Sequence, residues 1–401
     1  MTGMARRLSI CFVGTPWLAV GPVRGGIEKI LWELSRIMSR AHEVHTVGPS
    51  PRENRIWAGK SDVVFHYAPI TELRDYPVRD RLDFTKEGIL LAVRLVFTIV
   101  IIIAFFAALR RKRGFDVTFI SNKYVAAPIL WGRRRGGHGV FIYSEQNIWP
   151  WLHPTPPRGS ARLRHKINVI LGRHVCRLSD LVHVNSESLR DAMAANGIDS
   201  KRLVSIPNGS GISSEDGSTP PPSHPIRVGF VGRLAEDKGI RILVDTIRAV
   251  NVARPEIRFD IFGDGPLRPF VLQAGLRNLT LWGERPRDQV LDALRLIHIT
   301  LFLSPVENIP SMALMEALAL GKAIVATDVG DTSRFLTHGR DALLCKADPA
   351  EVAEAVAALC DSPALYDTVT KGARALAAFY TWEEIARRHL DMYTSLLSES
   401  S

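Results

Sequence analysis

Short apolar, β-branched runs alternate along this chain with segments of helical periodicity, and this alternation constrains the fold more than any other feature. Between the first two runs, Ile27, Ile30, Leu31, Leu34 and Ile37 fall on one face of a helix. Strands that alternate with helices form a parallel sheet covered on both faces. The first group of runs covers residues 8–14, 42–48, 62–69, 115–121, 139–145, 181–186 and 203–207.

The alternation stops at a polar stretch and then restarts. Residues 209–225, GSGISSEDGSTPPPSHP, have the Ser, Gly and Pro content of a linker. A second group of runs covers residues 226–232, 258–263, 279–283, 299–304, 323–328 and 342–345. We therefore predict an α/β protein of two doubly wound Rossmann-like domains facing across a cleft, where the carboxyl ends of the strands bind ligands.

The expected domain boundaries follow from these groups. Residues 1–207 form the first domain, 208–225 the linker and 226–380 the second domain. Residues 381–401 form a last helix that can pack on either domain, including back on the first. A length of 401 residues suits two domains.

Charge is distributed unequally between the halves. The net charge is +10, but residues 1–206 hold 31 Lys and Arg against 16 Asp and Glu, whereas the remainder holds 20 against 25. The first half is thus expected to meet an anionic partner. The cysteines, Cys11, Cys176, Cys345 and Cys360, form no C-x-x-C pair and indicate buried free thiols in a reducing compartment.

Two apolar segments raise the question of a membrane. Residues 1–21 carry Arg6 and Arg7 before an apolar run, but residues 8–14 fit a first strand better than a signal peptide. Residues 88–109 have spanning length, yet they contain Arg94 and lie between pieces of one predicted domain. We favour a non-spanning helix there, either buried in the core or partly exposed at a membrane interface with the basic residues 110–113 facing anionic headgroups.

Several catalytic signatures are missing. The sequence contains no G-x-x-x-x-G-K-[ST], H-E-x-x-H or G-x-S-x-G motif. Gly263-Asp-Gly265 begins a dinucleotide-binding pattern, but Arg268 stands where its third glycine belongs. Interpretations as an ATPase, a dehydrogenase, a zinc protease or an α/β-hydrolase therefore lose their main support.

Two glycine-containing turns follow first strands. Gly25 and Gly26 open a helix after residues 8–14, and exposed amides at such a helix start can accept a phosphate, although a double glycine also suits a plain turn. Arg233 and Lys238 follow residues 226–232. Two cations at a strand end can hold a diphosphate and stabilise its charge as a leaving group, unless they are only a solvated basic pair.

A third constellation pairs two carboxylates. Glu307 lies in the proline-marked turn after residues 299–304, and Glu316 is expected about two turns into the following helix. Both can accept hydrogen bonds from hydroxyl groups in the cleft. A plain alternative is one carboxylate favoured by the helix dipole and one surface glutamate.

In this order and spacing, the segments resemble the retaining nucleotide-sugar glycosyltransferases of the GT-B fold, in glycosyltransferase family four. The resemblance covers most of the chain and rests on GGIEKILWELS with RAHEVHTVGP, IPNG, FVGRLAEDKGI, FGDGPL and SPVENIPSMALMEALALGKAIVATDVG. It implies a hexosyltransferase that takes a UDP- or GDP-linked sugar, without cofactor or metal. Retention in such enzymes is generally explained by attack on the same face of the sugar.

The resemblance also implies roles for individual residues. Gly25, Gly26 and Gly263 would lie in the donor site, and Arg233 with Lys238 would grip the diphosphate. Glu316 would bind the ribose hydroxyls. Glu307 would sit by the transferred sugar, as would Gln146, which stands where the family often has histidine.

This sequence departs from the family pattern in three places. Eight residues separate Glu307 from Glu316, one more than usual, so Asn308 is the alternative for the first position. Gln146 can hydrogen-bond but cannot carry a proton. Asp331 and Arg334 replace a glycine and an acidic residue of the family. All three departures concern sugar recognition more than nucleotide binding.

The basic first half is expected to serve the acceptor. Arg162, Lys166, Arg173 and Arg177 recur along residues 160–178, opposite an apolar face. Such a helix is often simply solvated, but here it leads us to expect a peripheral protein at the cytoplasmic membrane face that glycosylates a lipid-linked or glycan acceptor in cell-envelope or extracellular polysaccharide assembly. One rival is a non-catalytic scaffold with a degenerate transferase fold. Nucleic-acid binding rests on charge alone and is not expected.

Overall fold

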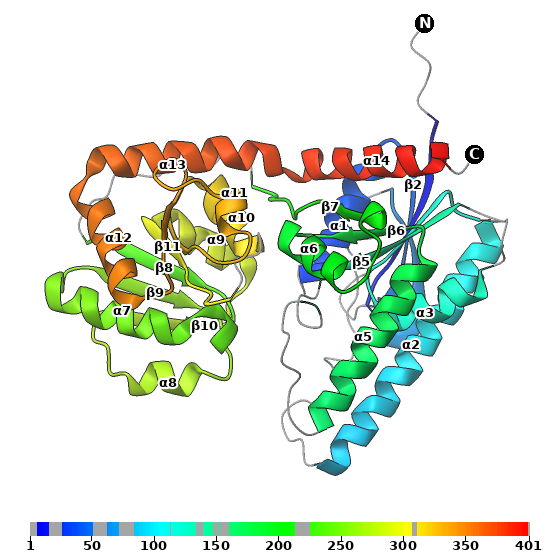
Figure 1. Ribbon diagram of the computed structural model, residues 1–401, viewed down its shortest axis with the longest axis horizontal. Coiled ribbons are helices and arrows are strands. Elements are labelled where there is room, and N and C mark those ends of the chain that lie inside the picture. The colour runs from blue at the N-terminus through cyan, green and yellow to red at the C-terminus, as the bar shows by residue number, and fades with distance from the viewer. Residues whose placement is uncertain are drawn as a thin grey trace, which may run out of the picture. The chain divides into compact units, whose positions relative to one another are not determined.

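The computed structural model describes residues 6–15, 26–50, 62–71, 84–112, 114–133, 139–146, 151, 160–212, 225–306 and 311–399 (Figure 1). The chain divides into two compact units. Unit 1 comprises residues 1–206 together with 385–401, and unit 2 comprises residues 207–384. Residues 213–224 of the predicted linker lie outside the described ranges.

Unit 1 is built on a parallel sheet of seven strands in the order β3-β2-β1-β4-β5-β6-β7. The strand order reverses between β1 and β4, which pair directly, and ligands bind at such a switch point in doubly wound sheets. The strands are β1 (Ser9–Val13), β2 (Glu43–Ser50), β3 (Val64–Thr71), β4 (Val117–Ile120), β5 (Val140–Glu145), β6 (Leu181–Val184) and β7 (Leu203–Ser205).

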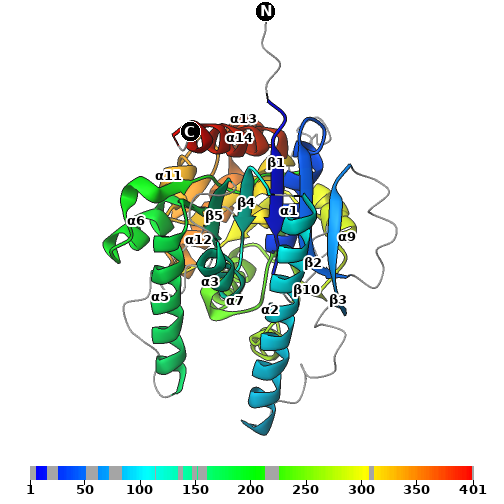
Figure 2. The same ribbon diagram turned by 90° about the vertical axis from the view of Figure 1, so that its right-hand side faces the viewer.

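Helices cover both faces of this sheet (Figure 2). They are α1 (Gly26–Met38), α2 (Phe84–Lys112), α3 (Lys123–Gly132), α5 (Ser160–Leu178), α6 (Glu187–Ala195) and α14 (Trp382–Glu399). The side chains of α2, α3, α5 and α6 share one apolar core with the sheet. On the opposite face, Trp32 of α1 stacks on Phe65, and His389 and Tyr393 of α14 pack against Phe119.

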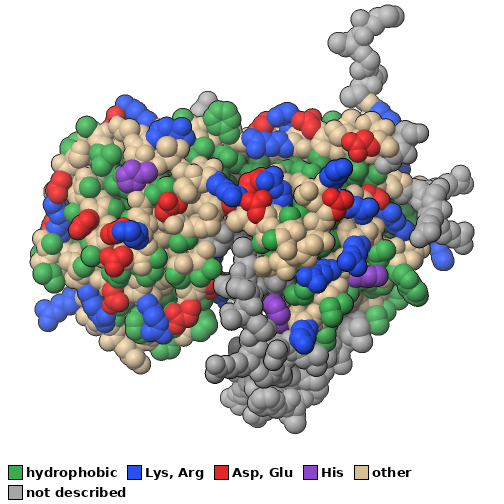
Figure 3. Space-filling view, in the orientation of Figure 1, with side chains coloured by type: hydrophobic (Ala, Val, Ile, Leu, Met, Phe, Trp, Pro, Cys, Tyr) green, Lys and Arg blue, Asp and Glu red, His purple; other side chains and the backbone are tan. Residues whose placement is uncertain are grey.

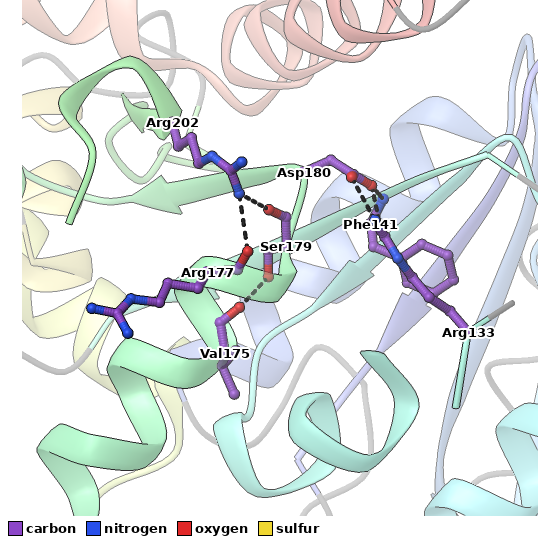
Figure 4. Close-up of polar contacts among 7 residues, drawn as sticks. All are labelled: Arg133, Phe141, Val175, Arg177, Ser179, Asp180 and Arg202. Carbon is purple, nitrogen blue, oxygen red and sulfur yellow. Dashed lines mark hydrogen bonds and ion pairs between the residues drawn. The ribbon is translucent and has the colours of Figure 1, made fainter. Parts of the chain in front are cut away.

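Polar contacts fix the turn from α5 into β6 (Figure 4). Arg202 Nη1 donates to the backbone oxygens of Arg177 and Ser179, at 3.0 and 3.1 Å, and so caps the end of α5. Arg133 forms a two-pronged ion pair with Asp180, at 2.6 and 2.8 Å, and Asp180 also accepts from the backbone amide of Phe141. Arg202 thus holds the end of α5, while Arg133 and Phe141 hold Asp180 just before β6.

Helix α2 is only half buried, which corrects the interpretation that it lies wholly in the core. Ile101 and Phe105 are fully buried, whereas Val96, Ile99 and Ile103 are 54%, 46% and 62% exposed. Residues 96–109, the part of this helix whose side chains are described, thus have one face on the sheet and one apolar face in solvent. In the described residues, no helix is both long enough and apolar enough to cross a membrane.

Unit 2 repeats the same plan with six parallel strands in the order β10-β9-β8-β11-β12-β13. The switch point lies between β8 and β11. The strands are β8 (Arg227–Val231), β9 (Arg258–Phe262), β10 (Leu279–Gly283), β11 (Ile299–Phe302), β12 (Ala323–Thr327) and β13 (Leu343–Cys345). The helices are α7 (Ile240–Ala253), α8 (Arg268–Gln273), α9 (Arg287–Leu296), α10 (Met312–Ala319), α11 (Thr332–Phe335), α12 (Pro349–Asp361) and α13 (Pro363–Ala377).

The predicted fold class, α/β with two doubly wound sheets, is confirmed. Each of the thirteen apolar runs coincides with one strand of the two sheets, although β2 and β3 extend two residues past their runs. All four cysteines are free, but only Cys11 and Cys176 are buried, and Cys345 and Cys360 are half-buried. Burial raises the pKa of the Cys176 thiol to about 12, so this thiol stays protonated.

Candidate functional site

In unit 2, the loops that follow β8 and β11 meet at the switch point. The side chain of Ser304, after β11, donates to the backbone oxygen of Asp237, after β8, at 2.8 Å. Gly239 has φ +70°, and a Cβ there would overlap the carbonyl oxygen of Leu303. Only glycine therefore allows these two loops to pack together.

The loop after β9 joins the same edge. Gly263 has φ +128°, and a Cβ at this position would overlap the backbone oxygen of Gly232. Leu234, after β8, donates its backbone amide to the oxygen of Asp264 at 3.0 Å. Gly263, one of the predicted donor-site residues, thus lets the loops after β8 and β9 approach closely.

Arg233 and Lys238 lie in the loop after β8, where the sequence placed them. The guanidinium of Arg233 is 62% exposed and pairs with Asp237 at 2.9 Å. Lys238 ends a short 3₁₀ turn, Glu236–Lys238, and is half-buried. Among the residues that the structure describes, its ammonium forms no ion pair. One paired and one unpaired cation at a strand end suit an anionic ligand.

Glu316 lies in the helix that follows β11, but its position differs from the prediction. Helix α10 begins at Met312 after the N-cap Ser311, so Glu316 is one turn into the helix rather than two. Its side chain is buried and accepts a hydrogen bond from Arg287 Nε at 2.8 Å. Glu307 and Asn308 lie outside the described residues.

Arg287 is a site residue that the sequence reasoning missed. It is the first residue of α9, in the loop region after β10, so it belongs to the same carboxyl edge as Lys238 and Glu316. Its Nη2 atom is buried and makes no hydrogen bond to the described protein. The signal available in the sequence was the pair of arginines in Glu284-Arg-Pro-Arg287, directly after a predicted strand.

In unit 1, Glu145 ends β5 at the carboxyl edge and is buried among polar neighbours. Its Oε2 accepts from the hydroxyl of Tyr143 at 2.9 Å and from the indole nitrogen of Trp151 at 3.3 Å. Lys123, at the start of α3, approaches the same oxygen to 3.5 Å. These contacts anchor the strand end that carries Gln146.

Gln146 follows directly and belongs to a second chain of hydrogen bonds. Its Nε2 donates to Ser144 Oγ at 3.3 Å, Ser144 Oγ lies 2.9 Å from Nδ1 of His183, and Nε2 of His183 lies 2.9 Å from the backbone oxygen of Ile206. Ser144 and His183 are buried, and Gln146 is half-buried. The side chain of Gln146 is thus held by a hydrogen-bond chain through the buried Ser144 and His183.

The first strand and helix of unit 1 also meet through a polar contact. The hydroxyl of Thr15, just after β1, donates to the buried carboxylate of Glu28 in α1. Gly26 is the first residue of α1, whereas Gly25 lies outside the described residues. Neither residue was given a role in the sequence analysis, although Glu28 lies in the GGIEKILWELS segment.

The candidate residues divide between the two units and include no metal cluster. Within the described residues, no group of three or more His, Cys, Asp or Glu side chains is placed to hold a metal ion. Arg233, Lys238, Gly263 and Glu316 all follow the carboxyl ends of strands of unit 2, and Gln146 follows a strand of unit 1.

Comparison with known proteins identifies a family for each half. Residues 24–210 match the glycosyltransferase family 4 domain, and residues 225–362 match the domain of glycosyl transferases group 1. The chain is 26% identical over 172 residues to an uncharacterized glycosyltransferase of Methanocaldococcus jannaschii, covering 42% of this chain and 47% of that protein.

Two further relatives extend this comparison. The chain is 27% identical over 183 residues to D-inositol 3-phosphate glycosyltransferase of Thermobispora bispora, covering 42% of each protein. It is 24% identical over 242 residues to a phosphatidylinositol N-acetylglucosaminyltransferase polypeptide of Arabidopsis thaliana, covering 59% of this chain and 53% of that one. The matches thus span about half the length of these relatives.

Solved structures share the fold over nearly the whole chain. Sucrose-phosphate synthase of Thermosynechococcus elongatus aligns with a TM-score of 0.74 at 18% identity, covering 98% of this chain and all of that one. HepE of Anabaena in complex with UDP-glucose aligns with a TM-score of 0.71 at 16% identity, covering 97% of this chain and all of HepE. The chain therefore belongs to glycosyltransferase family 4, among the glycosyl transferases group 1, and has the GT-B fold.

Proposed function

We propose that this protein is a retaining glycosyltransferase that moves a hexosyl group from a UDP- or GDP-linked sugar to a lipid-linked or glycan acceptor. The observation that carries the proposal is the carboxyl edge of unit 2. There Arg233 and Lys238, on the loop after β8, lie on the same sheet edge as the Arg287–Glu316 pair. Cations suit a diphosphate, and a buried carboxylate suits ribose hydroxyls.

The chemistry follows from where charge develops. As the bond between the sugar and the diphosphate breaks, the leaving diphosphate gains negative charge, and cations fixed beside it stabilise the transition state more than the ground state. Arg233 and Lys238 are proposed for this role, and we propose that turnover needs no divalent metal. Gly25 and Gly26 would offer backbone amides to the donor or acceptor.

The sugar and the acceptor are assigned to groups whose roles rest on the family resemblance. Gln146 is proposed to address the transferred sugar as a hydrogen-bonding group, since an amide cannot take a proton from the acceptor. Glu307, or Asn308 in its place, would complete the sugar site. Base catalysis by a side chain at position 146 is therefore not part of the proposed retaining mechanism.

The printed names of similar proteins support the substrate classes. HepE was solved with UDP-glucose, and phosphatidylinositol N-acetylglucosaminyltransferase is named for a lipid. We accordingly propose a peripheral protein at the cytoplasmic face of the membrane that acts in cell-envelope or extracellular polysaccharide assembly.

Calorimetric titration with UDP and with GDP tests the donor site. The Arg233→Ala, Lys238→Ala double variant should lose the binding that the wild type shows for one of the two nucleotides. Arg258→Ala, Arg277→Ala is the matched control, because both side chains are exposed and lie at the opposite edge of the sheet, where Arg258 begins β9 and Arg277 precedes β10. Equal binding by all three proteins would contradict the proposed diphosphate site.

Turnover separates the enzyme from the scaffold alternative. Incubation of the matching nucleotide sugar with membrane lipid extract should release free nucleotide diphosphate, with and without EDTA. Product anomers measured by NMR should have the configuration of the donor. Nucleotide binding without any release would favour a scaffold, and inversion of configuration would exclude retention.

A further inference from the structure

Three neighbouring helices on one face of unit 1 leave large apolar side chains in solvent. Helix α3 packs between α2 and α5, and Tyr124 of α3 donates to Asn168 of α5 at 2.6 Å. The exposed side chains on these helices are Val96, Ile99 and Ile103 of α2, Tyr124 and Trp131 of α3, and Ile167 and Ile170 of α5. Trp131 is 83% exposed and Ile170 is 67% exposed. We call this surface the α2-α3-α5 face.

The charged residues of these three helices are nearly all basic. Together they contain eleven Lys and Arg and one acidic residue, Glu87, a net charge of +10 that equals the net charge of the whole chain. On the opposite face of the sheet, the charges of α1 cancel and α14 carries −2. Among the described side chains of α1 and α14, no large apolar group is exposed.

Several of these cations are free to meet an external anion. Lys166, Arg110 and Arg111 are exposed, and the guanidinium of Arg177 points away from the contacts that cap α5 (Figure 4). Lys112 and Lys123, in contrast, already pair with Glu43 and Glu145. In the space-filling view, basic and histidine side chains lie beside hydrophobic ones over α5 (Figure 3).

We propose that the α2-α3-α5 face docks into the interface of an anionic membrane, with its isoleucine and tryptophan side chains between the lipid headgroups. A surface that is both apolar and cationic fits this partner because the acyl boundary takes the apolar groups and the headgroups take the cations. A second copy of the chain fits poorly, since two faces that each carry an excess of positive charge repel each other. A nucleic acid offers no apolar layer for isoleucine side chains.

The position of this face indicates how a lipid-linked acceptor would reach the enzyme. Only this step of the inference rests on the proposed function. Helices α2 and α5 extend past the carboxyl ends of the strands of unit 1, as Figure 2 shows. Gln146 follows the carboxyl end of β5, at that same edge of the sheet. A membrane held against these helices would bring the headgroup of a lipid-linked acceptor to the edge where Gln146 lies.

Vesicle co-sedimentation tests the docking. The wild type should pellet with phosphatidylcholine vesicles that contain phosphatidylglycerol, and binding should weaken between about 50 and about 500 mM NaCl as the charges are screened. Binding to pure phosphatidylcholine should be weaker. The apolar contribution is tested by Ile103→Ser, Ile170→Ser, for which we expect roughly a tenfold loss in partition coefficient per side chain.

Charge reversal tests the electrostatic contribution to vesicle binding. Lys166→Glu, Arg177→Glu should lower the partition coefficient at low salt by at least about 25-fold, about fivefold for each basic side chain lost. Matched controls come from unit 2. Val252→Ser, Leu272→Ser replaces two exposed apolar side chains, and Arg258→Glu, Arg277→Glu makes the same change in net charge. Both controls should bind vesicles as the wild type does.

Three outcomes would overturn the proposal. Wild-type protein that stays in the supernatant with anionic vesicles at low salt would do so, as would equal losses in the test and control variants. A dimer that dissociates on Ile103→Ser, Ile170→Ser, without vesicle binding, would make the face a contact between copies instead. Circular dichroism and urea unfolding of each variant show that it is folded, and calorimetry with UDP and GDP separates failure of docking from failure of the donor site.

Discussion

Ser144 Oγ lies 2.9 Å from Nδ1 of His183, in a buried hydrogen-bond chain whose donors and acceptors can be assigned. The carbonyl oxygen of Ile206 can only accept, so Nε2 of His183 carries the hydrogen in that bond. Burial lowers the pKa of His183 to about 4, so the ring is neutral near pH 7 and its Nδ1 accepts from Ser144. Ser144 Oγ in turn accepts from the amide of Gln146, whose carbonyl oxygen is directed away from it.

Replacing Ser144 should therefore release Gln146. Ser144→Ala leaves Nδ1 of His183 buried without a donor, and we expect a loss of about 1–3 kcal/mol in the free energy of unfolding. If Gln146 contacts the transferred sugar, kcat should also fall while KM for the nucleotide sugar changes little. Ser144→Thr keeps the hydroxyl and should restore both. Urea unfolding and steady-state kinetics provide the measurements.

The same buried histidine, with His389 beside it, predicts a loss of stability in acid. The rings lie 4.8 Å apart, and burial lowers the pKa of both. Because the unfolded chain binds protons near pH 6.5 and the folded chain does not, stability is full above that pH and falls as the pH drops toward 4. His183 alone accounts for about 3 kcal/mol at the lower end.

Urea unfolding between pH 7.5 and 4.5 measures this dependence. His389→Gln, whose amide does not titrate, should make the decline shallower, although the protein starts from lower stability. His174→Gln changes an exposed histidine of α5 and should leave the slope unchanged. Identical slopes for all three proteins would rule out the buried pair as the origin of the acid sensitivity.

The sheets were predictable because parallel strands are buried on both faces. Strands such as β4, β5 and β12 are buried at every residue, so they appear in the sequence as mostly apolar runs. Helix α2 was harder, since a run of isoleucines has the same hydropathy whether it faces a core or solvent. Its exposed stripe of Val96, Ile99 and Ile103 depends on which face meets the sheet, and only the fold decides that.

Site residues were predictable only where one short segment contains them. Arg233 and Lys238 stand in a single loop, and Gln146 directly follows a strand. Arg287 and Glu316 are 29 residues apart, and Ser144 and His183 are 39 apart, so each pair becomes visible only once the sheet is assembled. The depth of Glu316 in α10 was overestimated because Ser311, rather than an earlier residue, caps the helix.

The Arg287–Glu316 pair predicts a coupling between stability and nucleotide binding. Arg287→Ala leaves the buried carboxylate of Glu316 without this partner, and we expect a loss of about 1–2 kcal/mol in the free energy of unfolding, since the guanidinium is partly exposed. Glu316→Gln should weaken nucleotide binding by about 1–3 kcal/mol through a poorer acceptor for hydroxyl groups.

A double-mutant cycle on these two residues separates the effects. The coupling energy in unfolding should be about 0.5–3 kcal/mol, because the two side chains are in direct contact. Arg295→Ala serves as the control, since Arg295 pairs with the exposed Asp292 in the same helix α9. Additive unfolding energies for Arg287 and Glu316 would show that their contact does not stabilise the protein.

Two glycines with nearly the same φ angle predict very different costs of substitution by alanine. Gly239 has φ +70° and Gly275 has φ +64°, so alanine at either position pays the strain of the left-handed region, about 1–2 kcal/mol. At Gly275 a Cβ meets nothing within 4 Å, whereas at Gly239 it overlaps the carbonyl oxygen of Leu303.

Gly239→Ala must therefore push the loops after β8 and β11 apart. We expect a loss of more than about 3 kcal/mol in unfolding free energy, together with loss of nucleotide binding, because Lys238 moves with its loop. Gly275→Ala should lose only the strain energy and bind nucleotide normally. Urea unfolding and calorimetry provide the measurements. Equal losses for the two variants would show that the loops tolerate a Cβ at their contact.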